Sequence, residues 1–168
     1  MILDDALVER FSRQILLPEV GGRGQERLCA ATIVVEGDDL AARVAATLLA
    51  AAGPRVVMHA GPPGRIAILT SDAIGVRTRH HATGGVVATL AGRPCLRCAP
   101  VPAAPTAARA LDDDAAAQAI GSVAASEALC LLLGVATSRA QSIDLARGTF
   151  TGQALTGTKG CPVCGASR

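Results

Sequence analysis

The amino-acid sequence predicts an α/β fold that is held by a zinc clip. A short apolar run at 31–35 is followed by a helical stretch rich in alanine and leucine and then by a second apolar run at 55–59. This order is typical of a βαβ unit, in which the two strands are parallel. Two Cys-x-x-Cys pairs, at 95–98 and 161–164, have the spacing of zinc knuckles. Together these observations predict strands, flanking helices and a metal site in one domain.

The N-terminal residues are expected to form a helical arm. Between residues 3 and 17 apolar side chains recur at helical spacing, Asp4 or Asp5 is placed to cap the first turn, and Pro18 ends the pattern. Three glycines follow, and residues 25–28 are expected to form only a short turn before the first strand.

The strand at 31–35 leads into the helix of the βαβ unit. Asp38 or Asp39 is expected to cap this helix, and Gly53 is expected to end it. The next predicted elements are a turn at 61–64 and three strands, at 66–70, 76–79 and 85–90.

A second long helix is predicted after a linker at 101–110. One of the aspartates at 112–114 would cap this helix, which runs through Leu133 and ends at Gly134. The small residues Gly121, Ser122, Ala124 and Ala125 would let it approach a neighbouring element closely. Two weak strands are predicted after it, near 142–144 and 153–155.

Length and composition are those of one domain without a membrane or nucleic-acid partner. The chain has 168 residues, 50% of them hydrophobic, and a formal net charge of only +2. It has two Phe and no Trp or Tyr, so the stacking aromatics of nucleic-acid binding are missing. No apolar run reaches the roughly 18 residues of a membrane span and no leader is visible, so a cytoplasmic location is expected. The domain divides into a helical arm (1–30), the βαβ unit (31–60), strands with the first cysteine pair (61–98), and a linker, long helix and second cysteine pair (99–168).

The two cysteine pairs are the strongest motif. Cys95, Cys98, Cys161 and Cys164 offer four thiolates, which satisfy a tetrahedral Zn²⁺ and leave no open position, as in structural sites. The 62 residues at 99–160 that separate the pairs exceed a small zinc ribbon, so the metal would join distant parts of one fold. The alternatives are that one pair is a redox-active dithiol or that the cysteines are simply buried.

Four other residues have reactive side chains, and no catalytic or metal-binding role is expected for them. Cys29 and Cys130 lie in apolar sequence surroundings and are expected in the core. His80 and His81 are adjacent at a predicted strand end. They could serve as ligands or bases, but a surface position is favoured.

Several segments, in order, resemble the ThiF/MoeB/HesA family of ubiquitin-activating-like adenylyltransferases. The matching segments are Arg10–Pro18 with Gly24–Glu26, Ile33–Val35 with Ala51–Gly53, Arg93–Cys98 after Gly84-Gly85, Gly121-Ser122 with Glu127–Leu129 and Leu133-Gly134, and Gly160–Gly165. The resemblance spans nearly the whole chain. It implies a Rossmann-like βαβ start with a shortened mixed sheet, flanking helices and a four-cysteine zinc clip.

The resemblance also implies a chemistry. Members of this family adenylate the C-terminal glycine of a ubiquitin-like sulfur-carrier protein: the carboxylate attacks the α-phosphate of ATP and releases pyrophosphate. They are commonly dimers, so a homodimer or a heterodimer with a full-length homologue is expected. The residue that matches Arg13 reaches toward ATP in the partner subunit. Arg13 is therefore a candidate catalytic residue, and the alternative is a solvated cation at a helix end.

The sequence departs from this family at the nucleotide-binding loop. The family loop, Gly-x-Gly-Gly-x-Gly, lets backbone N–H groups approach phosphates. Here it reads Glu-Gly-Asp-Asp-Leu-Ala at 36–41, and only Gly37 is a glycine. Asp38 and Asp39 would repel a triphosphate, which is hard to reconcile with ordinary binding of ATP and Mg²⁺. They could hold Mg²⁺ directly, but a helix cap is favoured.

The sequence also lacks the catalytic middle of the family domain. After His59 the chain passes through the turn at 61–64 almost directly to the strands of the first knuckle, without the family's acidic, Asn/Arg/Gln, Lys and Asp positions. No cysteine matches the family's persulfide or thioester position. The first interpretation is a degenerate scaffold or partner subunit. The others are an active minimal adenylyltransferase that uses residues supplied in trans and, weakest, a zinc module for nucleic acid.

Overall fold

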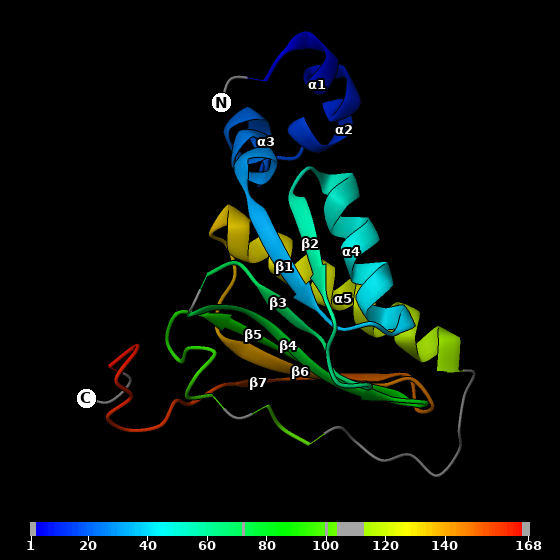
Figure 1. Ribbon diagram of the computed structural model, residues 1–168, viewed down its shortest axis with the longest axis vertical. Helices are drawn as coiled ribbons and strands as arrows, with labels where there is room; N and C mark the ends of the chain where they lie inside the picture. Colours follow the sequence, from blue (N-terminus) through cyan, green and yellow to red (C-terminus); the bar gives the residue numbers. More distant parts are fainter. Residues whose placement is uncertain (1–2, 72, 100, 104–112, 166–168) are drawn as a thin grey trace.

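The computed structural model describes residues 3–71, 73–99, 101–103 and 113–165 (Figure 1). Its centre is a seven-stranded mixed sheet with the strand order β2-β1-β3-β4-β5-β6-β7. Two long helices, α4 and α5, pack on one face of this sheet. Most of the predicted linker at 101–110, and Asp112 of the predicted cap at 112–114, lie outside the described residues.

The N-terminal arm contains three short helices, where one helix and a turn were expected. They are α1 (Asp5–Arg10), α2 (Ser12–Ile15) and α3 (Gly21–Ala30). Asp4 caps α1 as predicted, because its carboxylate accepts a hydrogen bond from the Leu7 nitrogen (2.8 Å). The break between α1 and α2 falls at Phe11, whose side chain is buried and whose backbone leaves helical values.

Helix α3 corrects the expectation of a short turn at 25–28. Its buried face carries Gln25 and Leu28, and the Gln25 amide donates a hydrogen bond to the Ala52 carbonyl (2.9 Å). A Cβ on Gly24 would lie 2.9 Å from the Leu133 side chain, so α3 packs closely on α5. Tertiary packing therefore stabilises a helix whose glycines oppose it locally.

The predicted βαβ unit is confirmed. It comprises β1 (Thr32–Glu36), α4 (Leu40–Ala52) and β2 (Arg55–His59), and the two strands pair in parallel from Thr32 opposite Arg55 to Glu36 opposite His59. Gly53 ends α4 with a φ of 127°, a backbone conformation that favours glycine. These elements bring the loop at 37–39 to the carboxyl end of β1.

The remaining strands are antiparallel and longer than predicted, β3 excepted. They are β3 (Ala67–Leu69), β4 (Ile74–His81), β5 (Gly84–Ala91), β6 (Arg139–Asp144) and β7 (Thr149–Ala154). Strand β3 pairs antiparallel with β1 and so changes a parallel start into a mixed sheet. Strand β7 is exposed along its whole length, so no alternation of buried and exposed residues marks its true bounds in the sequence.

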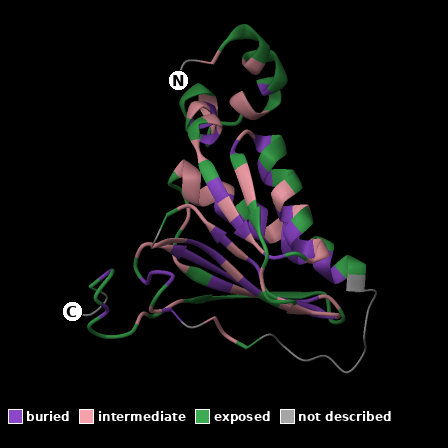
Figure 2. Ribbon diagram, viewed as in Figure 1, coloured by how far each residue is buried: buried purple, intermediate pink, exposed green. Residues whose placement is uncertain are grey.

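Helix α5 (Asp113–Leu133) covers β4 and β5 and crosses against α4. A Cβ on Gly121 would lie 2.4 Å from the Ala41 carbonyl oxygen, which confirms that the small residues permit a close approach. Buried residues of α4, α5 and the sheet form one core (Figure 2). By length and composition the segment Asp114–Leu133 could span a membrane, but 44% of its most apolar window is buried inside the fold, and a core helix has the same character.

Candidate functional site

The four predicted metal ligands come together in one cluster. All four Sγ atoms of Cys95, Cys98, Cys161 and Cys164 lie within 4.8 Å of one another. The Sγ–Sγ distances are 3.8 Å for Cys95–Cys98, 3.8 Å for Cys95–Cys161 and 3.6 Å for Cys98–Cys164. A tetrahedron with Zn–S bonds of about 2.3 Å has S–S edges of about 3.8 Å. The donor set and its spacing therefore fit a tetrahedral metal such as zinc.

Local turns aim each pair of sulfurs at the same point. The nitrogens of Cys98 and Ala99 donate to the Cys95 carbonyl (3.2 and 3.1 Å), and the Gly165 nitrogen donates to the Cys161 carbonyl (2.9 Å). The Thr158 hydroxyl donates to the Cys98 carbonyl (3.0 Å), so a direct hydrogen bond also joins the two knuckle segments.

Electrostatics favour metal binding at this cluster. Backbone N–H groups of Cys164 and Val163 point at the Cys161 sulfur and, together with the neighbouring sulfurs, lower the pKa of that thiol to about 6. The thiolate is the form that binds a metal, so Cys161 is prepared as a ligand near neutral pH. With four protein ligands a bound metal has no open position, and its effect is on the fold.

The loop after β1 is closed by the chain itself. The Gly37 nitrogen donates to the His59 carbonyl (2.9 Å). A Cβ on Gly61 would lie 2.8 Å from the Gly37 nitrogen, and a Cβ on Gly37 would lie 3.3 Å from the Arg65 carbonyl oxygen. The segment from Gly61 to Arg65 therefore lies against the loop at backbone contact distance.

Asp39 is the centre of this closed loop. One carboxylate oxygen accepts from the Ala42 nitrogen (3.0 Å) and caps α4, as favoured from the sequence. The other accepts from the Gly64 nitrogen (3.2 Å) and lies 3.2 Å from the His80 Nε2. Asp38 is exposed, and its side chain makes no hydrogen bond or ion pair with these groups. The two adjacent aspartates therefore have different environments.

The expected surface position of the two histidines is wrong. The His80 side chain is only 9% exposed, because β4 turns it toward Asp39 beneath the 61–64 turn. Burial lowers the pKa of His80 from its usual value, although Asp39 opposes the shift. The His81 Nδ1 lies 2.9 Å from the Thr83 hydroxyl. No motif or spacing in the sequence predicts the His80–Asp39 contact, which joins residues 41 positions apart.

Arg13 is exposed on α2 and is not brought near the loop at 37–39. The N-terminal arm lies at the start of β1 and the loop lies at its end (Figure 1). Within one chain Arg13 therefore serves no site formed by Gly37, Asp38 and Asp39.

The two remaining cysteines lie outside the four-cysteine cluster and are half-buried, where core positions were expected. The Cys29 sulfur lies 3.5 Å from the Gln25 amide nitrogen. Burial and the Glu127 carboxylate raise the pKa of the Cys130 thiol, which makes it a poorer nucleophile.

Comparison with protein-family models and with curated proteins finds no match to this chain. Its functional interpretation therefore rests on the residues and contacts described above.

Proposed function

We propose that this chain is a catalytically degenerate relative of the ThiF/MoeB/HesA adenylyltransferases, with β1, α4 and β2 as a Rossmann-like start. In this proposal it acts as a zinc-stabilised scaffold or partner subunit for a ubiquitin-like sulfur carrier or for a full-length homologue. The ordered sequence resemblance supports the family, and the cysteine cluster supports the zinc clip.

The closed loop is the observation that best supports a loss of catalytic activity. A nucleotide loop must present free backbone N–H groups to phosphates at a helix N-terminus. Here the Gly37 nitrogen is bonded to His59, Asp39 caps α4, and Gly61 lies against Gly37. Like charges about 4 Å apart at an effective dielectric near 20 repel by about 4 kcal/mol, roughly a thousandfold in affinity. Steric closure and charge thus both oppose a triphosphate at this loop.

The zinc clip has a structural role in this proposal. Cys95 and Cys98 follow the buried strand β5, whereas Cys161 and Cys164 follow the exposed edge strand β7. A metal on all four sulfurs anchors the C-terminal segment to the best-buried part of the sheet. That anchoring would hold a binding surface in place without any catalytic contribution from the metal.

The alternative function is an active minimal adenylyltransferase that receives residues from a second subunit. The exposure of Arg13 on α2, away from its own loop, is the one observation that favours it. Under this alternative Arg13 would complete the nucleotide site of a partner, in agreement with the role that the resemblance implies.

The test is ATP–pyrophosphate exchange, which reports adenylation without a need to trap the product. The zinc-loaded chain is assayed with a ubiquitin-like protein ending in Gly-Gly, and a full-length family enzyme is the positive control. We expect no exchange above buffer from the chain alone. Exchange by the chain alone would refute the degenerate interpretation.

A second measurement tests the scaffold role. Sedimentation velocity should detect a complex between the chain and either the carrier or a full-length homologue. Failure to bind both would contradict the scaffold. If a mixture with a homologue gives more exchange than the homologue alone, and Arg13→Ala in this chain abolishes that excess, the alternative is correct.

A further inference from the structure

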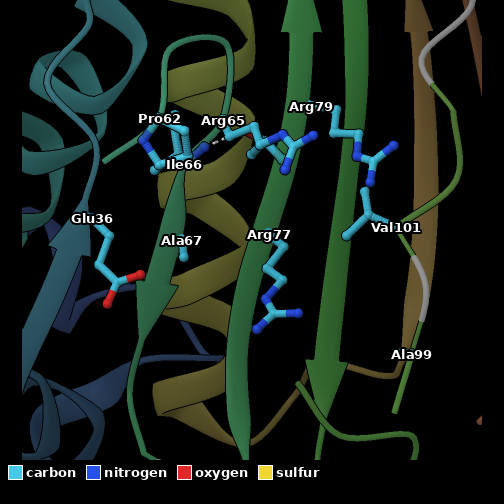
Figure 3. Close-up of a pocket in the computed structure, with 10 residues that line it drawn as sticks. Glu36, Pro62, Arg65, Ile66, Ala67, Arg77, Arg79, Ala99 and Val101 are labelled. Carbon is cyan, nitrogen blue, oxygen red and sulfur yellow. Dashed lines mark hydrogen bonds between the residues drawn. The ribbon is translucent and has the colours of Figure 1, made fainter. Parts of the chain in front are cut away.

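A cavity of about 310 Å³ lies on the face of the sheet that α4 and α5 leave uncovered (Figure 3). Ile68 and Val76 point into the core beneath the helices, so their neighbours Ala67 and Arg77 point to the opposite face. Arg77 and Arg79 on β4, Arg65 before β3 and Glu36 at the end of β1 line the cavity. This volume lies at the lower end of the range for small-molecule sites.

The three arginines of this cavity are neighbours by backbone pairing. Arg77 and Arg79 are two residues apart on one strand and so share a face. The Thr78 nitrogen donates to the Ile66 carbonyl (2.8 Å), which places Arg65 beside Arg79 across the two strands. Figure 3 shows the Arg65 side chain extending toward β4.

None of these guanidinium groups has a carboxylate partner among the described residues. The ion pairs among the described residues join His80 with Asp39, Arg139 with Glu127 and Arg147 with Asp144. Three unpaired cations on one cavity repel one another, and an anion with two or more charges would remove that repulsion. The planar guanidinium fork matches phosphate and carboxylate oxygens.

We infer that this cavity binds a small anion with at least two negative charges, carried by phosphate or carboxylate groups. Glu36 lies on β1, across β3 from Arg77 and Arg79 (Figure 3). Its carboxylate repels the anion from that wall and so orients the ligand toward β4. The site does not rest on the proposed function, because it uses the helix-free face of the sheet and not the loop that Asp39 closes.

Binding is measured by calorimetry on the zinc-loaded chain at constant, low ionic strength. Pyrophosphate is the phosphate probe and tricarballylate is the carboxylate probe, and zinc content is measured before and after each titration. We expect saturable binding of at least one probe, and the stronger one identifies the ligand's charged group. Saturable binding of neither would overturn the inference, whatever the exchange assay gives.

Matched variants locate the site. Arg77→Gln and Arg79→Gln should each weaken binding by about tenfold or more, since each removes charge-assisted hydrogen bonds. Arg55→Gln removes the same charge from exposed β2 outside the cavity and should change the affinity less than twofold. Circular dichroism checks that each variant is folded. If Arg55→Gln lost as much affinity for the anion, the effect would come from the net charge of the protein alone, and the proposed site would be overturned.

Glu36→Gln tests the orientation. Removing a like charge from the opposite wall should tighten anion binding severalfold. Unchanged or weaker binding would place the anion elsewhere and would also overturn the inference.

Discussion

Replacing Cys161 by serine should release the metal and loosen the attachment of the C-terminal segment. The cluster closes a loop through the 62 residues at 99–160 that separate Cys98 from Cys161. Treated as a cross-link, a closure of this length is worth about 4 kcal/mol of chain entropy in the unfolded state. For a domain of this size, a loss of about 4 kcal/mol lowers the unfolding temperature by roughly 8 to 16 °C.

Two measurements on the same samples check this prediction. Metal content per chain should fall from one zinc to none in Cys161→Ser and in Cys164→Ser, and the unfolding temperature should fall with it. A chelator should move the wild type toward the variants, since metal-binding free energy contributes to folding free energy. Cys130→Ser is the control, because this half-buried thiol lies outside the cluster. If both cluster variants keep full metal and an unchanged unfolding temperature, the clip is wrong.

Two further predictions concern buried polar contacts. Burial holds the His80 pKa below its usual 6.5, so the unfolded chain binds more protons and stability should fall as pH drops below about 6.5. As the pH is lowered, the denaturant midpoint should fall less in His80→Gln than in wild type, whereas the exposed His59→Gln should behave as wild type. The same dependence of the midpoint on pH in all three proteins would refute this prediction. Glu127, 5% exposed, accepts from the Arg139 guanidinium (2.6 Å) and the Gln141 amide (2.9 Å). Glu127→Ala should lower the free energy of unfolding, measured with denaturant, by about 2 kcal/mol. This loss is smaller than that for a fully buried pair, because Arg139 is half-exposed. A loss no larger than that of the exposed Glu9→Ala would contradict the prediction.

The parts of the fold with strong local signals could be predicted from the sequence. Asp39 and Gly53 bound α4 because a cap and a left-handed C-terminus are short-range requirements. The four cysteines could be grouped because tetrahedral metal chemistry needs paired thiolates, whatever their separation. In each case the type of residue indicates the local backbone geometry or the metal chemistry that the position needs.

The features that could not be predicted from the sequence depend on contacts between residues that are distant in the chain. Helix α3 contains glycines that disfavour a helix locally, and it forms because Gly24 packs on Leu133. His80 lies against the Asp39 carboxylate, which also caps α4, and no spacing rule reveals this contact between residues 41 positions apart. The arginines of the cavity are separated in sequence by strand β3, and only the register of β3 and β4 brings them together.

The separation of the two cysteine pairs along the chain has a consequence for biosynthesis. Cys95 and Cys98 leave the ribosome before Cys161 by more than 60 positions, and α5 and two strands are made in between. At a synthesis rate of about 5–20 residues per second, the first pair waits roughly 3 to 12 seconds for its partners. During that interval two thiols stand ready for oxidants, stray metals or other nascent chains. A metal that needs all four sulfurs would therefore be captured late, and its binding would distinguish chains that carry both pairs from those that carry only the first.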